Sequence, residues 1–146
     1  MTKIHKSALV AYSAEQMFDL VNHIEAYPEF LPWCSKTQVL KTDENYMIAS
    51  ISIAKGPIQS SFTTENKLHR QASPLKIELN LKEGPFKDLS GYWQFIPLKE
   101  TATKVTLDLE FEFSNSLMKM TLGPVFEQIA AGLVEAFCKR AKDIYD

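Results

Sequence analysis

The histidines and cysteines of this chain are the side chains best suited to bind a metal or carry redox chemistry. His5, His23 and His69 lie far apart in the sequence, and neither an H-x₃-H nor an HExxH pattern occurs. Cys34 and Cys138 are the only cysteines, and no CxxC is present. Zinc sites and redox-active cysteine pairs usually need such short spacings, because their groups must meet at one point. The sequence therefore predicts no metal site and two free thiols, which are typical of a reducing compartment.

Paired carboxylates are the next candidates, because glycosidases and proteases use them as acid and base. Asp108, Glu110 and Glu112 alternate with apolar residues, so in a β-strand they would share the solvated face. Such carboxylates lack the desolvation that raises a catalytic pKa. His69 and Tyr92 are weaker candidates, and no nucleophile elbow, phosphate-binding loop or dinucleotide fingerprint occurs. We therefore expect no catalytic residue and a protein that is not an enzyme.

Most of the chain has the period of β-strands. The segment 103–113 is the clearest, with a dry face formed by Val105, Leu107, Leu109, Phe111 and Phe113. Further strands are predicted at residues 3–10, 36–42, 46–54, 58–69, 76–82 and 89–97, separated by turn residues. One dry and one wet face are typical of an antiparallel sheet that is covered on one side.

Helical patterns occur at two places. Ser13 and Gln16 have the spacing of a capping box, followed by an apolar face that Pro28 ends, and residues 27–32 suit a second short helix. From Gly123 and Pro124 to Tyr145 the apolar residues recur at helical spacing, with an earlier helical turn at 117–122 kinked at Pro124. This last helix would be roughly 30 Å long, enough to cross a small domain.

These elements predict an α+β fold with one domain spanning residues 1–146. A seven-stranded antiparallel sheet would wrap around the long C-terminal helix, with two short helices after the first strand. Because a strongly twisted sheet curls, a helix in its concavity does not fill every corner, and a hydrophobic cavity follows. We expect it to be lined by Ile51, Phe62, Ile77, Leu79, Trp93, Leu107, Leu109, Phe126, Ile129, Leu133 and Phe137. The inward-facing strand positions that the pattern identifies are all apolar.

Three longer motifs carry a family resemblance: residues 27–34 (YPEFLPWC), residues 83–95 (EGPFKDLSGYWQF), and residues 125–137 with Arg140 and Ala141. They resemble the family of coenzyme-Q-binding proteins and ribosome-association toxins (RatA), within the START-like (polyketide cyclase/dehydrase) superfamily. The opening residues 8–17 resemble the bacterial RatA branch. The resemblance covers essentially the whole chain and implies a helix-grip fold with a hydrophobic tunnel.

The resemblance implies two different functions. The mitochondrial relatives are implied to bind ubiquinone and support respiration, and the RatA branch to bind the large ribosomal subunit and block subunit joining. We expect first a non-enzymatic protein that binds ubiquinone or a similar isoprenoid lipid, with no cofactor required. The alternatives are the ribosome-directed toxin and, third, a polyketide-cyclase-like enzyme.

Charge bears on the possible partners. The net charge of −2 gives no global reason to bind DNA or RNA. Two local basic clusters are candidate ribosome contacts: Lys67 with Arg70, and Lys139, Arg140 and Lys142. The N-terminal residues suit neither a signal peptide nor a membrane span, so we expect a cytoplasmic protein with no transmembrane segment. A transient contact with a membrane surface stays open.

Overall fold

The computed structural model describes all residues from Met1 to Asp146. Its strands are β1 (Thr2–Val10), β2 (Cys34–Thr42), β3 (Tyr46–Lys55), β4 (Ile58–His69), β5 (Leu75–Glu83), β6 (Phe86–Lys99) and β7 (Ala102–Phe113). They form one seven-stranded sheet in the order β1-β7-β6-β5-β4-β3-β2, and every neighbouring pair is antiparallel. The predicted sheet is therefore confirmed.

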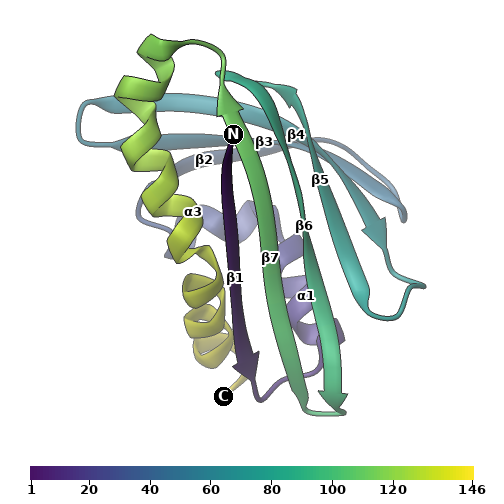
Figure 1. Cartoon of the computed structure of the whole chain (residues 1–146). Helices are drawn as coiled ribbons and strands as arrows, with labels where there is room; N and C mark the ends of the chain where they lie inside the picture. The colour runs from purple at the N-terminus through teal and green to yellow at the C-terminus, as the bar shows by residue number, and fades with distance from the viewer.

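The sheet is strongly curved, and the helices lie in its concavity. In Figure 1, β1, β7, β6 and β5 run steeply across the front, and β2, β3 and β4 cross behind them at a large angle. Strands β6 and β7 approach closely at Gly91, since a Cβ there would meet the Asp108 carbonyl oxygen at 2.1 Å and the Leu109 Cα at 2.9 Å. Only glycine lets the β6 backbone approach β7 this closely.

Three short elements follow β1 and close one end of the concavity. Helix α1 (Ala14–Asn22) begins with the predicted capping box, in which the Ser13 side chain accepts from the Gln16 amide and the Gln16 side chain accepts from the Ser13 amide. A 3₁₀ turn, η1 (Ile24–Ala26), and the short helix α2 (Tyr27–Phe30) come next. The first helix ends at Asn22, so the expectation that Pro28 ends it is wrong: Pro28 lies in the first turn of α2 instead.

The C-terminal helix α3 (Ser116–Tyr145) joins the predicted helical turn at 117–122 and the predicted long helix into one continuous element. We expected its main part to begin near Pro124, but it begins at Ser116, and Pro124 lies inside it. The Asn115 side chain accepts a hydrogen bond from the Met118 amide and so caps the helix. A good cap upstream lets the helix pass through a proline, which removes one backbone donor.

Buried side chains between α3 and the sheet form two separate clusters. The first, here called the helical-end cluster, contains 20 buried residues and includes the buried faces of α1 and η1. The second, the aromatic cluster, contains 10 buried residues: Ile53, Phe86, Leu89, Leu109, Phe111, Phe113, Leu122, Phe126, Ile129 and Ala130. Along α3 the boundary lies between Ala130 and Val134, and along β6 between Leu89 and Trp93. The core is thus divided in the middle of the concavity.

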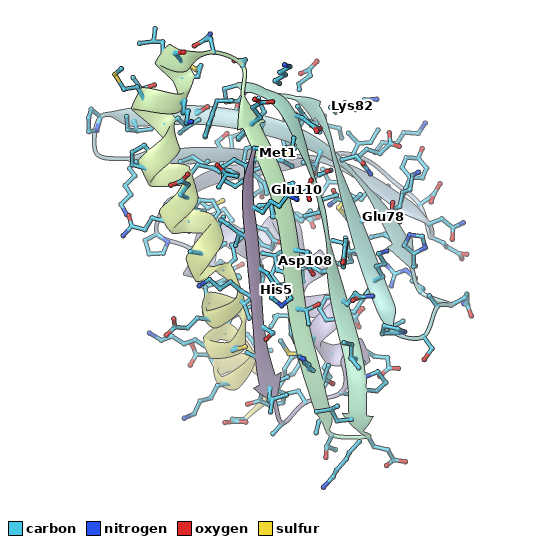
Figure 2. All side chains as sticks on the ribbon, viewed as in Figure 1. Met1, His5, Glu78, Lys82, Asp108 and Glu110 are labelled. Atoms are coloured by element: carbon cyan, nitrogen blue, oxygen red, sulfur yellow. The ribbon has the colours of Figure 1, made fainter.

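The convex face of the sheet carries the charges that the alternating pattern predicts. Lys3 pairs with Glu110 at 3.5 Å, and His5 contacts Asp108. Figure 2 shows His5, Glu78, Lys82, Asp108 and Glu110 on the face of the sheet turned away from α3. These pairs are largely solvated, so each contributes little to stability. None of the helices is both long enough and apolar enough to cross a membrane.

Candidate apolar binding cavity

The gap between the two clusters is an apolar cavity of about 80 Å³. Of its 17 lining residues, 15 are hydrophobic. The sheet and the short elements contribute Ile24, Tyr27, Trp33, Ile51, Ile53, Phe62, Thr64, Asn66, Leu79, Leu89, Trp93 and Leu109, and α3 contributes Phe126, Ile129, Ala130, Leu133 and Phe137. The wall thus draws on both clusters and on α3.

Nine of the eleven residues that the sequence places in the wall lie there: Ile51, Phe62, Leu79, Trp93, Leu109, Phe126, Ile129, Leu133 and Phe137. The other two, Ile77 and Leu107, point to the same side of the sheet but are packed inside the helical-end cluster. Each precedes a wall residue by two positions on its strand, toward the end that α1 covers. Alternation identifies the face of a strand, but it does not identify where along the strand a helix leaves space.

Two polar residues interrupt the wall, at inward-facing positions that are not among the apolar ones predicted from the sequence. Thr64 and Asn66 on β4 are only 6% and 4% exposed, and the Thr64 hydroxyl donates to the Asn66 Oδ1 at 2.7 Å. The sequence does contain a pattern that places them inward: Phe62, Thr64, Asn66 and Leu68 are spaced by two, so they share one face of β4. The half-buried Phe62 and the buried Leu68 flank the pair on this face, so the pair interrupts an otherwise apolar strip along β4.

Tyr27 is the only titratable residue in the wall. Its hydroxyl donates to the Val21 carbonyl oxygen, and burial raises its pKa far above the usual range. Tyr27 is therefore neutral at physiological pH and is already engaged in a structural hydrogen bond. The two weaker acid or base candidates lie elsewhere: His69 contacts Glu78, and the Tyr92 ring receives the Lys76 ammonium, both on the opposite face of the sheet. The wall therefore presents no group poised for proton transfer.

The two arginines among the candidate ribosome contacts are engaged within the chain. Arg140 pairs with Glu29 at 3.1 Å and stacks on the Phe30 ring, and only 18% of its side chain is exposed. Arg70 stacks on the Phe18 ring at 4.8 Å and lies 3.9 Å from a carboxylate of α1. Both arginines thus fasten the short helices to the rest of the fold, and their charges are partly neutralised by acidic neighbours.

The lysines of these clusters are in a different position. Lys67, Lys139 and Lys142 are exposed, and none of them forms an ion pair in the structure. Lys139 and Lys142 are one helical turn apart near the end of α3, where the helix dipole favours positive charge. Any phosphate contact by these clusters would therefore depend on the lysines.

A curved antiparallel sheet that grips a long C-terminal helix over an apolar cavity defines the helix-grip class of START-like folds. The family model "Polyketide cyclase / dehydrase and lipid transport" matches residues 10–138. A ribosome association toxin RatA from Pseudomonas aeruginosa is 52% identical over 99% of this chain and 98% of its own length. This chain therefore belongs to the polyketide cyclase/dehydrase and lipid transport family and groups within it with the RatA proteins.

More distant relatives extend the comparison. The RatA protein of Escherichia coli is 43% identical over 99% of this chain and 90% of its own length. A mitochondrial coenzyme Q-binding protein homolog from Xenopus laevis is 28% identical over 96% of this chain and 58% of its own length. Among solved structures, the Zhui aromatase/cyclase from Streptomyces superposes with a TM-score of 0.81 at 15% identity, covering 97% of this chain and 93% of that one. At that identity the likeness shows the fold alone.

Proposed function

We propose that this protein binds an elongated apolar molecule in the cavity between α3 and the sheet, without catalysing a reaction. The observation that carries the proposal is the lining, because 15 of 17 wall residues are hydrophobic and no charged side chain is among them. Such a wall favours an apolar ligand and offers few acidic, basic or nucleophilic groups for catalysis. The ligand that we propose is ubiquinone or a similar isoprenoid lipid, as the name of the Xenopus relative suggests.

The size of the cavity adds a requirement. Pockets that bury drug-sized ligands measure roughly 300–1,000 Å³, whereas this cavity measures about 80 Å³. A quinone ring with even a short tail therefore enters only if the walls move apart. Since all other walls belong to one continuous sheet or to elements packed on it, we propose that α3 shifts outward when the ligand enters.

Extraction of the purified protein tests this proposal. Protein isolated from its native host is extracted with organic solvent, and the extract is analysed by mass spectrometry. An isoprenoid lipid in stoichiometric amount supports the proposal, and an extract no richer in lipid than that of an unrelated protein contradicts it. Ala130→Leu is the variant with a blocked cavity, because the larger side chain at this wall position occupies the cavity space. Ala131→Leu on the exposed side of α3 is its matched control.

A second candidate function is association with the ribosome. It is favoured by the names of the relatives at 52% and 43% identity and by the unpaired lysines at the end of α3. We propose that Lys139 and Lys142, rather than Arg140, would contact phosphates of the large subunit, and that Lys67, rather than Arg70, would form a secondary contact. This activity would place the protein in the cytoplasm. The two functions use separate parts of the molecule, so each is testable without the other.

Sedimentation through a gradient tests the second candidate. Purified protein is added to dissociated subunits, magnesium is restored, and the fractions are assayed for the protein and for joined ribosomes. Co-migration with the large subunit that weakens in Lys139→Glu/Lys142→Glu supports the proposal. Arg140 is left intact in this variant, since its loss would release Glu29 and Phe30. Absence of co-migration at low salt would leave only the ligand-binding function.

A further inference from the structure

The polar pair on β4 stands out because it is buried in the wall with an incomplete set of partners. The Asn66 Oδ1 accepts from Thr64, but the Asn66 amide nitrogen donates no hydrogen bond within the protein. Its neighbours across the sheet are Met47 on β3 and Leu79 on β5, and neither side chain offers an oxygen acceptor. Asn66 is 4% exposed and lines the cavity, and its amide nitrogen is not among the fully enclosed polar atoms without a partner, so this nitrogen borders open space.

From this geometry we infer that Asn66 is the recognition point for a carbonyl oxygen on the apolar ligand. The inference rests on the proposed function, which it deepens by assigning the ligand a polar end. In the structure the Thr64 hydroxyl donates to the amide oxygen, which leaves the amide nitrogen free to meet the ligand. The amide nitrogen of this cavity-lining residue then has no acceptor within the protein, and the oxygen of a quinone or ketone is a matching acceptor.

The position of Asn66 also gives the ligand a direction. Met47 and Leu68, the buried neighbours of Asn66 across and along the sheet, belong to the helical-end cluster. Phe62 and Phe126, at the other end of the wall, pack against one another at 5.9 Å in the aromatic cluster. The carbonyl-bearing end of the ligand therefore lies toward the helical-end cluster, and its hydrocarbon tail extends among the phenylalanines.

Competition with two matched probes tests the assignment. Decylubiquinone and decylbenzene carry the same ten-carbon tail, but only the first has ring carbonyls. Each displaces the apolar fluorophore N-phenyl-1-naphthylamine from the wild-type protein and from Asn66→Leu. Loss of one hydrogen bond to the ligand should weaken decylubiquinone binding roughly tenfold. Decylbenzene binding should stay the same or become tighter, because the cavity becomes more apolar.

Two further variants separate recognition from a structural effect. Thr64→Val releases the Asn66 amide oxygen, so decylubiquinone binding should weaken roughly threefold with no change for decylbenzene. Asn80→Leu makes the same replacement at an exposed position of β5 and should change neither. Equal weakening of both probes in Asn66→Leu, or no weakening of either, would overturn the assignment while the proposed function stands. If neither probe displaces the fluorophore from the wild-type protein, the proposed function fails and the assignment fails with it.

Discussion

The two ends of the core are built differently. In the helical-end cluster, the ring centroid of Phe137 on α3 lies 5.2 Å from that of Tyr27, 5.3 Å from that of Phe30 and 5.4 Å from that of Trp93. Helix α3 therefore contacts both the short helices and the sheet here. In the aromatic cluster, Phe126 contacts only rings of the sheet, including Phe86 and Phe111, and no other helix contributes a buried residue.

This difference indicates how the fold can hold a core and a cavity together. The helical-end cluster is enclosed on several sides, so it fixes the C-terminal half of α3. The other half, from Ser116 to about Ala130, is held by the sheet alone and contains the interior Pro124. If α3 shifts to admit a ligand, this half moves and the C-terminal half serves as the pivot.

The largest effect is expected from a charge placed where the clusters meet. Leu109 is 5% exposed and lies in the cavity wall. Leu109→Arg buries an unpaired cation, and we expect a loss of about 4 kcal/mol or more in the free energy of unfolding, together with loss of ligand binding. Leu9→Arg on β1 is the control, since Leu9 is 72% exposed. Urea denaturation measures the free energy of unfolding of both variants, and circular dichroism checks that any variant tested for binding is folded.

Truncation of one ring in each cluster tests their independence. Phe126→Ala and Phe137→Ala should each lower the free energy of unfolding by about 3–5 kcal/mol. The two residues are eleven positions apart on α3, or roughly 16 Å. Their effects should therefore add to within about 0.5 kcal/mol in the double variant. A coupling energy above about 1 kcal/mol would mean that the two clusters act as one core.

Gly91 lies on β6 between the wall residues Leu89 and Trp93, where the strand passes from one cluster to the other. Gly91→Ala should cost about 1–3 kcal/mol, because a Cβ there meets the backbone of β7 at 2.1 Å, and backbone cannot move aside as a side chain can. Gly132→Ala is the matched control. It has open space around it within α3 and should stabilise the protein by about 0.5–1 kcal/mol. Thermal unfolding of both variants measures the difference, and a neutral Gly91→Ala would contradict the close approach.

The smallest expected effect concerns the helical-end cluster and pH. Burial raises the pKa of Tyr27 above the ordinary value of 10.0, so the folded state retains a proton that the unfolded state loses above pH 10. The contribution of Tyr27 to the free energy of unfolding is complete below pH 10. Above pH 10 it declines by about 1.4 kcal/mol per pH unit. Tyr27→Phe should remove this part of the decline and cost about 1 kcal/mol at neutral pH for the lost bond to Val21. Urea unfolding at pH 8 and pH 11 measures the decline in the free energy of unfolding for the wild-type protein and for Tyr27→Phe. An equal decline in the two proteins would contradict this prediction.

The sequence predicts the sheet and most of the wall because alternation is a local property of each strand. Leu79, Trp93 and Leu109 were placed from their own strands, without knowledge of the packing. The sequence predicts a helical turn at 117–122, but it places the start of the main helix near Pro124, because Pro124 has the stronger local signal and the cap by Asn115 depends on one side chain. Asn66 was missed because polar residues on a strand are ordinarily assigned to the wet face. That the whole chain forms one domain stays a prediction.

The central claim is that the gap between the two clusters admits an apolar ligand. Trp33 and Trp93 both lie in the wall, so their fluorescence reports on occupancy directly. Titration with decylubiquinone should quench this fluorescence to a plateau at one ligand per chain in the wild-type protein and in Ala131→Leu, and much less in Ala130→Leu. Quenching that rises linearly without a plateau, or that is identical in Ala130→Leu and Ala131→Leu, would show that the quinone does not occupy this cavity.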